Sequence, residues 1–390
     1  MRVVYIFEST PQGGAYKALL AMINEMRQLG VDVIILTGKR SALNDNLDRE
    51  GFKNVAAGHE TAIIPVHFHG ILKPLRLLKT CLLYYKSEWR AVKDASKQIN
   101  FKEIDLIHTN SARSTIGCRL SKKYGIPHIT HLREFGDRDF DCIKRTPFYE
   151  RILNNGTTAF ISISKAIQTY WNSKGIDVKK NHLIYDGSYY KDITVSSDDS
   201  KRAKALKMII AGGVYPTKGQ HLAVEAMGFL SDEVRNNITL DIAGWGDKQY
   251  IAEMKQYAEE HGYANQIHFL GAINDVHERT GMYQIGLMCS RSEGFGLVTS
   301  EYMHGRLGVI ASNAGSCPEL ITDGMEGQLF TSGDAKSLAD CILRYYNDRE
   351  FLIKMSIAAQ KKARECFTSE LNARNIIDLY KRLLKDEAQD

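Results

Sequence analysis

Two glutamates eight residues apart enclose a turn that could bind a charged ligand. Glu293 is followed by Gly294, Phe295 and Gly296, and Glu301 completes the segment. Backbone N–H groups exposed at such glycines can bind phosphate oxygens, while carboxylates accept hydrogen bonds from hydroxyl groups. This combination suits a sugar nucleotide. An ordinary turn with two solvated glutamates is the alternative interpretation of the same residues.

The residues on either side predict the elements that would hold this turn. The apolar run Ile285–Cys289 is typical of a buried parallel strand, and Leu297–His304 can form a helix that ends at Gly305. The first N–H groups of that helix would face the ligand, and the helix dipole favours an anion there. Glu293, before the turn, and Glu301, about one helical turn inside, can flank one pocket.

Two further strand-and-turn units in the second half carry polar residues. The predicted strand Met208–Val214 leads into a turn that contains Lys218, and a lysine there could neutralise phosphate. The strand Val309–Ala311 leads into a turn with Gly315 and Glu319 near a helix start. A solvated lysine is the alternative for Lys218, and only the other turns favour a function.

Short apolar runs alternate with helical patterns along the first half, which predicts βαβ units and a parallel sheet. A helix over Ala15–Leu29 should end at Gly30. The predicted strands of this half are Val3–Phe7, Val31–Thr37, Ile63–Phe68, Asp105–Thr109, His128–Leu132 and Ala159–Ser164. In the second half the series continues with Ile238–Ala243 and Ile267–Leu270, and the chain after Asp334 is mostly helical.

Two features of the first half could contact a substrate. Gly13 and Gly14 precede the first helix and offer backbone N–H groups to an anion or a hydroxyl group. They do not form the G-x-G-x-x-G dinucleotide fingerprint, and a plain tight turn is equally consistent with them. His131 lies at the carboxyl end of a predicted strand, where open α/β sheets bind ligands, although a lone histidine is more often structural.

The candidate metal ligands of the first half do not form a recognisable metal site. His67 and His69 share one face of a strand, but no third ligand lies nearby. The D-x-D spacings within Asp137–Asp141 follow Gly136 in a predicted loop, which favours a solvated acidic loop over a divalent-ion site. We therefore expect no bound metal.

Residues 71–102 carry eight basic side chains and two acidic ones. The basic residues that share one helical face are Lys86, Arg90, Lys93 and Lys97. Another face carries Tyr85, Trp89 and Val92. This pattern predicts a surface helix that contacts anionic lipid. A core-facing helix with a solvated basic side is the alternative.

The composition excludes several classes of protein. At 390 residues the chain exceeds the usual size of a single core, which predicts two domains. The net charge of +5 gives no sign of nucleic-acid binding. Seven cysteines without a C-x-x-C spacing fit a reducing cytosol better than disulfides or a zinc site. The apolar start ends at Glu8, so we expect neither a signal peptide nor a membrane span, and we expect a cytoplasmic location.

The polar segment 194–204 lacks periodicity and is typical of a linker between domains. We therefore expect an N-terminal domain over residues 1–195 and a C-terminal domain over residues 196–371. The strand–helix alternation restarts after the linker, which supports two separate α/β domains.

Together these motifs resemble the glycosyltransferases of family 4, which have the GT-B architecture. The resemblance covers nearly the whole chain and is strongest over residues 208–330. The matching positions are Gly13 and Gly14 of the N-terminal glycine loop, the family histidine His131, Lys218 and Gly219 of the lysine turn, Glu293 and Glu301 of the E-x7-E signature, and the segment 313–319 with its glycine and glutamate.

The resemblance implies an α/β fold with two Rossmann-like domains that face each other across a cleft. The first would bind the acceptor and the second the nucleotide-sugar, and a last helix within residues 372–390 would pack back on the first. Transfer would retain the anomeric configuration and need no cofactor or metal. The expected partners are a nucleotide-sugar, commonly a UDP-sugar, and a glycan or lipid-linked acceptor in surface polysaccharide or glycolipid synthesis. Residues 71–102 could add peripheral contact with the inner face of the cell membrane.

The family pattern also implies a role for each matching residue. Glu293 would contact the donor sugar, Lys218 would steady the leaving diphosphate, and His131 would act from the acceptor side. Gly13 and Gly14 would close the site on that side. The donor-binding positions would be Gly213, Gly294, Phe295, Gly296, Leu297 and Val298, together with Glu301, which would hold the ribose hydroxyls.

Gly213 departs from the family pattern, because an arginine commonly stands at this position. Losing a charged hydrogen bond to phosphate costs roughly 1.5–3 kcal/mol, which is roughly ten- to a hundredfold in affinity or rate. Arg291 is one candidate to replace that charge, and a solvated loop residue is the alternative for it.

Gly213 also supports a second hypothesis, a non-catalytic GT-B subunit that binds a partner enzyme or a membrane. The intact set that opposes it is Glu293, Glu301, Lys218 and His131. A third hypothesis, an NAD-dependent enzyme, lacks the dinucleotide fingerprint.

Overall fold

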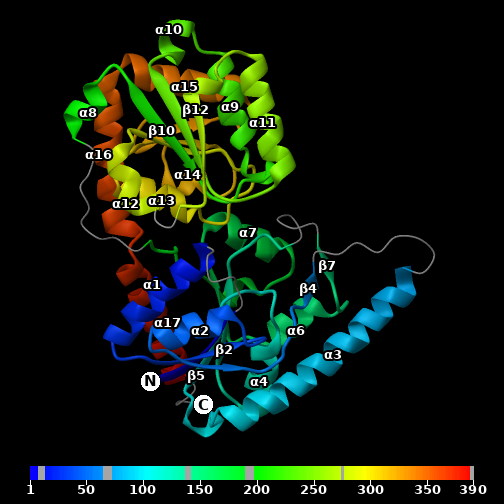
Figure 1. The fold of residues 1–390 in the computed structure, drawn as a ribbon. Helices are drawn as coiled ribbons and strands as arrows, with labels where there is room; N and C mark the ends of the chain where they lie inside the picture. Colours follow the sequence, from blue (N-terminus) through cyan, green and yellow to red (C-terminus); the bar gives the residue numbers. More distant parts are fainter. Residues whose placement is uncertain (8–13, 65–72, 137–141, 189–196, 274–275, 387–390) are drawn as a thin grey trace. The chain divides into compact units, whose positions relative to one another are not determined.

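The computed structural model describes residues 1–7, 14–64, 73–136, 142–188, 197–273 and 276–386. The chain divides into two compact units (Figure 1). Unit 1 contains residues 1–186 and the C-terminal segment from Ser369, and unit 2 contains residues 187–368. The sequence placed the first boundary at 195 and the C-terminal return at 372. Gly13, His67, His69 and the acidic segment 137–141 lie outside the described residues.

Unit 1 is built on a seven-stranded parallel sheet with the strand order β3-β2-β1-β5-β6-β8-β9. Its strands are β1 (Arg2–Ile6), β2 (Asp32–Thr37), β3 (Lys53–Ala56), β5 (Leu106–Thr109), β6 (His128–Leu132), β8 (Ala159–Ser162) and β9 (Asn181–Leu183). The strand predicted over Ile63–Phe68 begins at Ile63 as expected, but its described part, β4 (Ile63–Ile64), does not join this sheet. β4 pairs antiparallel with β7 (Ile143–Lys144) in a separate two-stranded sheet. The apolar pattern that predicts a strand does not show which partner the strand will pair with.

The helices of unit 1 cover the seven-stranded sheet and bury its apolar residues (Figure 1). They are α1 (Gly14–Gln28), α2 (Ala42–Arg49), α3 (Lys73–Gln98), α4 (Ile116–Tyr124), α6 (Tyr149–Gly156), α7 (Lys165–Ser173) and α17 (Ser369–Asp386). On α17, Ala373, Ile376 and Tyr380 are fully buried in the same core as Met22 and Met26 of α1. Hydrophobic burial therefore holds the end of the chain on unit 1.

Unit 2 is built on a six-stranded parallel sheet with the order β12-β11-β10-β13-β14-β15. The strands are β10 (Leu206–Ala211), β11 (Ile238–Ala243), β12 (Ile267–Gly271), β13 (Ile285–Met288), β14 (Gly308–Ser312) and β15 (Gly327–Phe330). The helices are α8 (Asp198–Arg202), α9 (Gln220–Gly228), α10 (Asp232–Arg235), α11 (Lys248–Glu260), α12 (Val276–Arg279), α13 (Leu297–His304), α14 (Cys317–Leu320), α15 (Ala335–Asn347) and α16 (Arg349–Cys366). The structure thus has the predicted parallel α/β organisation in each unit.

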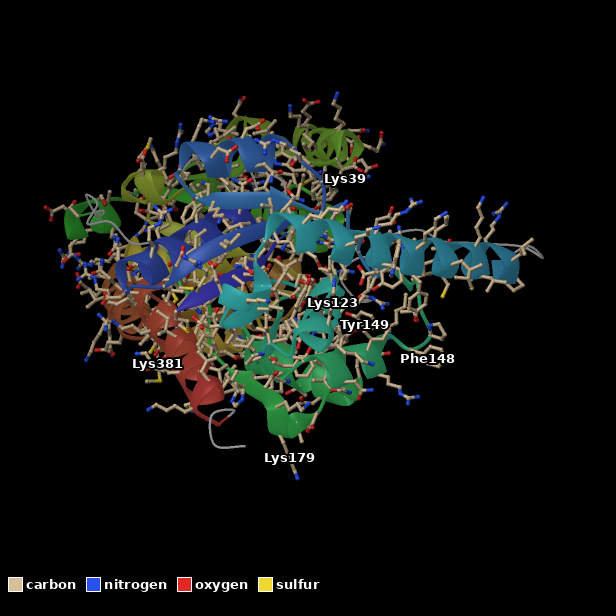
Figure 2. All side chains as sticks on the ribbon, turned by 90° about the horizontal axis from the view of Figure 1, so that it is seen from below. Lys39, Lys123, Phe148, Tyr149, Lys179 and Lys381 are labelled. Atoms are coloured by element: carbon tan, nitrogen blue, oxygen red, sulfur yellow. The ribbon has the colours of Figure 1, made fainter. Side chains whose placement is uncertain are left out.

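Helix α3 is attached to unit 1 mainly from Tyr84 onward. Tyr84, Glu88, Ala91 and Ala95 are buried, and Glu88 accepts hydrogen bonds of 2.9 Å from Thr115 and Arg119 of the α4 region. The N-terminal half extends away from the rest of the unit (Figures 1 and 2). The burial of Glu88 raises the pKa of its carboxyl group, although Arg119 acts in the opposite direction.

The four basic residues predicted to share one face of α3 are all exposed: Lys86, Arg90, Lys93 and Lys97. Trp89, on the neighbouring predicted face, is 66% exposed, and the Lys93 ammonium lies 5.5 Å from the centre of its ring. Apolar residues on more than one side of the helix leave its buried face ambiguous from periodicity alone.

Three histidines are fully buried in the parallel sheet of unit 1. They are His108 on β5 and His128 and His131 on β6. His128 donates from Nδ1 to the Gly156 carbonyl oxygen at 2.6 Å and accepts at Nε2 from the Thr109 hydroxyl group at 2.8 Å. Burial lowers the pKa of His128 to about 4 and moves the pKa of His108 and His131 well below the ordinary histidine value.

These shifts predict that unit 1 loses stability as the pH falls below about 6.5. Unfolded histidines bind a proton near that pH, whereas the folded ones stay neutral until a lower pH. The unfolded state therefore binds more protons between about pH 6.5 and 4. The free energy of unfolding should drop by up to ~4 kcal/mol per pH unit when all three histidines contribute.

Chemical denaturation of the wild-type protein and of a His128→Gln variant at several pH values measures this slope. We expect the variant, which has two of the three groups, to show about two thirds of the wild-type slope between pH 6.5 and 5. Equal slopes, or a wild-type stability that does not change over this range, would contradict the prediction.

Candidate active site

The polar residues predicted in unit 2 gather where the strand order of its sheet reverses. β10 pairs with β11 on one side and with β13 on the other, so the turns after β10 and β13 leave the sheet side by side. Open α/β sheets bind ligands outside the carboxyl ends of their strands at such a switch point. Lys218 lies in the turn after β10, and Glu293 lies in the turn after β13.

Lys218 and Glu293 form an ion pair across this switch point. The Lys218 Nζ donates to Glu293 Oε2 at 2.8 Å, although the two residues are 75 positions apart. The Lys218 side chain is 38% exposed and that of Glu293 is 16% exposed. The pair places a cation and a carboxylate together at a partly open position.

Two glycines let neighbouring turns close on the Glu293 turn. A β-carbon on Gly315, in the turn after β14, would lie 2.6 Å from the backbone nitrogen of Glu293. A β-carbon on Gly219, next to Lys218, would clash with the carbonyl oxygen of Cys289 at the end of β13. Both glycines also have a positive φ. Only glycine tolerates this conformation and this contact together.

Helix α13 begins at this turn with its first amides available. Gly296 is its N-cap residue with a φ of 80°, and the cap has no side-chain hydrogen bond. In the described part of the chain, the N–H groups of Leu297 and Val298 donate to no acceptor. The buried hydroxyl groups of Thr299 and Ser316 also lack a hydrogen-bond partner there. Unsatisfied donors at a helix N-terminus suit an anionic ligand.

The remaining predicted residues of this segment take different positions. The Phe295 side chain is buried and packs edge-on against Phe367 at a centroid distance of 5.6 Å, so only its backbone can serve a ligand. Gly294 is partly exposed at the start of the turn, and Glu301 is partly buried in the second turn of α13. The shared pocket of Glu293 and Glu301 stays a prediction.

Gly213 has a neighbour that would meet any side chain placed there. A β-carbon on Gly213 would lie 3.0 and 3.1 Å from two ring atoms of Tyr215. The Gly213 carbonyl oxygen accepts from the Gln220 side chain at 2.9 Å. Tyr215 packs edge-on against Trp245, and the two residues are 36% and 59% exposed.

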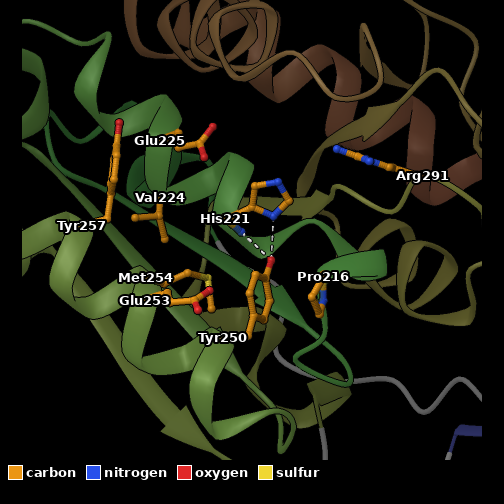
Figure 3. A pocket seen from close by; sticks show the side chains of 9 residues that line it. All are labelled: Pro216, His221, Val224, Glu225, Tyr250, Glu253, Met254, Tyr257 and Arg291. Atoms are coloured by element: carbon orange, nitrogen blue, oxygen red, sulfur yellow. Dashed lines mark hydrogen bonds between the residues drawn. The ribbon is translucent and has the colours of Figure 1, made fainter.

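Arg291 lines a cavity of about 410 Å³ between α9 and α11. Figure 3 shows its guanidinium group directed toward this cavity, opposite His221 and Tyr250. The Tyr250 hydroxyl group accepts from the His221 backbone N–H at 2.9 Å and shares a hydrogen bond of 2.7 Å with His221 Nδ1. The replacement of the missing arginine charge by Arg291 stays a prediction.

In unit 1, β1 and β5 are the strands between which the order reverses, and β6 follows β5. His131 on β6 is fully buried, and its Nδ1 lies 3.2 Å from His108 Nε2. Gly14 is the first residue of α1. Thr299, Ser316, His108 and Tyr380 were not singled out from the sequence. Thr299 and Ser316 lie beside the predicted glycines, which could have identified them.

Two sequence models of glycosyltransferase families match the chain. The family described as Glycosyltransferase Family 4 matches residues 12–187, and the family described as Glycosyl transferases group 1 matches residues 194–362. No described helix is long and apolar enough to cross a bilayer. In the described ranges, no group of three histidine, cysteine or carboxylate side chains is placed to share a metal ion.

Proteins with related sequences include named glycosyltransferases. N-acetyl-alpha-D-glucosaminyl L-malate synthase of Bacillus anthracis is 26% identical over 263 residues, which are 67% of this chain and 65% of that protein. The lipopolysaccharide core biosynthesis mannosyltransferase LpcC of Rhizobium leguminosarum bv. viciae is 31% identical over 185 residues, which are 45% of this chain and 50% of that protein. The match thus spans half to two thirds of these relatives.

Solved structures show the same fold over the whole chain. HepE of Anabaena in complex with UDP has a TM-score of 0.78 and 21% identity, and the match covers 98% of this chain and 100% of HepE. Sucrose-phosphate synthase from Thermosynechococcus elongatus has a TM-score of 0.75 and 18% identity, with 99% of both chains covered. With two Rossmann-like units and family matches in both of them, the chain belongs to the GT-B glycosyltransferases of the family 4 type.

Proposed function

We propose that this protein is a retaining glycosyltransferase that moves a sugar from a nucleotide-sugar to a glycan or lipid-linked acceptor. The observation that carries the proposal is the Lys218–Glu293 pair beside the open N-terminus of α13, at the switch point of the unit 2 sheet. Cation, amide donors and carboxylate are the groups that a diphosphate and a sugar need.

Charge development explains the proposed division of labour. The bond between the sugar anomeric carbon and the diphosphate breaks, and its electron pair goes to the phosphate oxygen. Lys218 and the α13 amides would stabilise that negative charge. The acceptor oxygen attacks the anomeric carbon from the same face, and its proton passes to the leaving phosphate oxygen. Glu293 would orient the sugar, and Glu301 would bind the ribose hydroxyl groups.

Relatives and structural neighbours support the choice of substrates. HepE has been solved with UDP and with UDP-glucose. Two relatives are named as lipopolysaccharide core mannosyltransferases, and another as a capsular polysaccharide biosynthesis glycosyltransferase. We infer that the donor is a nucleotide-sugar, with UDP-sugars the first to test, and that the product belongs to surface polysaccharide or glycolipid synthesis. The reaction as proposed uses no bound metal.

A non-catalytic GT-B subunit is the second candidate function, and Gly213 is the observation that favours it. A subunit that binds only a partner would not need the Lys218–Glu293 pair or the unsatisfied donors around α13. Nucleotide binding therefore separates the two candidates.

The first prediction for this site concerns Lys218 and Glu293. Saturating UDP at about 100 times its Kd should stabilise the wild-type protein by about 2.7 kcal/mol. Lys218→Ala should bind UDP at least tenfold more weakly, because it removes a charged hydrogen bond. Glu293→Ala should lower donor turnover at least tenfold while the protein stays folded. Thermal shift assays and a nucleotide-sugar hydrolysis screen measure these effects.

Lys204→Ala is the matched control, because Lys204 forms an exposed ion pair with Glu233 in the same unit at 3.3 Å. This variant should keep wild-type UDP binding and turnover. If Lys218→Ala and Glu293→Ala behave like Lys204→Ala, the assigned roles are wrong. If no nucleotide stabilises the wild-type protein, the result would favour the non-catalytic subunit over the glycosyltransferase.

The second prediction concerns the glycine at position 213. Gly213→Arg should tighten UDP binding about tenfold or more, since it restores a charged hydrogen bond to phosphate once the Tyr215 ring has moved aside. Gly213→Gln is the matched control, because it adds a chain of similar length without charge. Titration calorimetry with UDP measures both. Equal or weaker binding by Gly213→Arg than by Gly213→Gln would show that phosphate does not lie near this position.

We further propose that α3 places unit 1 on an anionic membrane surface. Leu75, Leu82 and Trp89, spaced seven residues apart on one face, are 63%, 63% and 66% exposed. The basic residues on or beside this face are Lys79, Lys86, Arg90 and Lys93, all exposed. Phe148 is also exposed, and its turn is tied to α3 by the 2.8 Å hydrogen bond between Tyr85 and Thr146. Apolar and basic side chains together suit a lipid interface.

The third prediction tests this membrane contact. Wild-type protein should bind vesicles that contain phosphatidylglycerol and should not bind neutral phosphatidylcholine vesicles. Each basic residue contributes about 1 kcal/mol near such a surface, so changing Lys86, Arg90, Lys93 and Lys97 to Glu should weaken binding by roughly a hundredfold or more. Vesicle co-sedimentation at two salt concentrations measures the effect.

The control variant carries the same charge change at exposed lysines elsewhere on unit 1, with Lys102, Lys122, Lys179 and Lys381 changed to Glu. It should bind vesicles better than the α3 variant. Equal binding by wild type and the α3 variant, or equal losses in the two variants, would remove α3 as the contact surface.

A further inference from the structure

A chain of hydrogen bonds inside unit 1 connects the last helix to His131. The Tyr380 hydroxyl oxygen of α17 lies 2.5 Å from His108 Nδ1, and His108 Nε2 lies 3.2 Å from His131 Nδ1. All three side chains are fully buried. Tyr380 and His108 are 272 residues apart in sequence. This chain of hydrogen bonds therefore depends on the packing of α17 against the N-terminal part of unit 1.

The direction of these hydrogen bonds follows from the chemistry of the two ring types. A phenol is a stronger acid than a neutral imidazole N–H, and an imidazole nitrogen is a stronger base than a phenol oxygen. A separation of 2.5 Å also falls in the range of O–H donors rather than N–H donors. Tyr380 therefore donates to His108 Nδ1. His108 must then carry its proton on Nε2 and donate it to His131 Nδ1.

This direction leaves His131 with its proton on Nε2. Among the described residues, His131 Nε2 has no hydrogen-bond partner, although the side chain is fully buried. A buried N–H without an acceptor is rare and needs an explanation. A ligand oxygen at this position would supply the missing acceptor. His131 stands at the carboxyl end of β6, the edge of the sheet where α/β proteins bind ligands.

We propose that Tyr380 and His108 are positioning residues that hold His131 as the neutral Nε2–H tautomer, so that His131 donates a hydrogen bond to a sugar hydroxyl oxygen. His131 would then orient a substrate rather than remove a proton from it. The role as a donor to substrate rests on the proposed glycosyl transfer. The tautomer itself does not depend on that function.

The surroundings of the two histidines keep them neutral. Burial is the main cause that lowers the pKa of both rings. His128 and then the Arg133 guanidinium group lower the pKa of His108 further, and Arg133 and then His108 lower that of His131. Arg133 is held by an ion pair with Asp186 and by a 3.2 Å hydrogen bond to Asn110. Asn110 in turn accepts from the Tyr5 hydroxyl group at 2.7 Å. A fixed cation beside the chain thus disfavours the imidazolium form.

The first test needs no ligand. Long-range proton–nitrogen spectra of the whole protein labelled with ¹⁵N-histidine distinguish the two tautomers of each ring. We expect both His108 and His131 to be protonated on Nε2 and bare on Nδ1, with their signals assigned through variants of each residue. Protonation of both rings on Nδ1 would mean that the chain runs in the reverse direction and would overturn the proposal.

The second test removes the donor that sets the direction. Tyr380→Phe should let the two histidines populate both tautomers and should lower kcat for nucleotide-sugar hydrolysis about tenfold. The control is Tyr149→Phe, which removes another buried hydroxyl group of unit 1, one that donates to the Ala112 carbonyl oxygen at 2.5 Å. The control should lose comparable stability but keep the wild-type tautomers and kcat. An unchanged tautomer in Tyr380→Phe would overturn the proposal.

The two readouts separate this proposal from the proposed function. If the Nε2–H tautomer is found and shifts in Tyr380→Phe, but no nucleotide-sugar is turned over, the positioning chain stands and glycosyl transfer fails. If turnover is found and Tyr380→Phe changes neither the tautomer nor kcat, glycosyl transfer stands and the positioning chain fails.

Discussion

The close approach of three turns at the carboxyl end of β13 is the constraint on which the candidate site depends. The turns after β10 and β14 can reach the β13 turn only because Gly219 and Gly315 carry no side chain where they meet Cys289 and Glu293. This contact brings Lys218 to Glu293 from another part of the sequence. It also leaves the first amides of α13 beside the pair. Packing of the backbone therefore creates the charge arrangement on which the proposed chemistry rests.

The two units place polar groups at corresponding points of their sheets but treat them differently. In unit 2 the Lys218–Glu293 pair is partly open and has donors to spare around it. In unit 1 the polar residues His108 and His131 are fully buried, and among the described residues His131 Nε2 has no hydrogen-bond partner. In the proposed reaction, the unit 1 residues would orient a substrate and the unit 2 residues would stabilise a leaving group.

Local sequence patterns predicted the elements that carry the candidate site better than they predicted the tertiary contacts between elements. The helix Leu297–His304 and the strand His128–Leu132 have the predicted bounds, because glycines and apolar runs mark their ends. The short strands β3, β9 and β15 were missed, since three or four residues give little periodicity. The contact between Tyr380 and His108 depends on tertiary packing. No spacing in the sequence encodes a contact over 272 residues.

The most direct measurement of the central claim is a crystal structure of the protein soaked with UDP. We expect the diphosphate oxygens within hydrogen-bond distance of Lys218 Nζ and of the Leu297 and Val298 amides at the start of α13. Density for UDP at another place, such as the cavity beside His221 and Tyr250, with the α13 turn empty would contradict the claim.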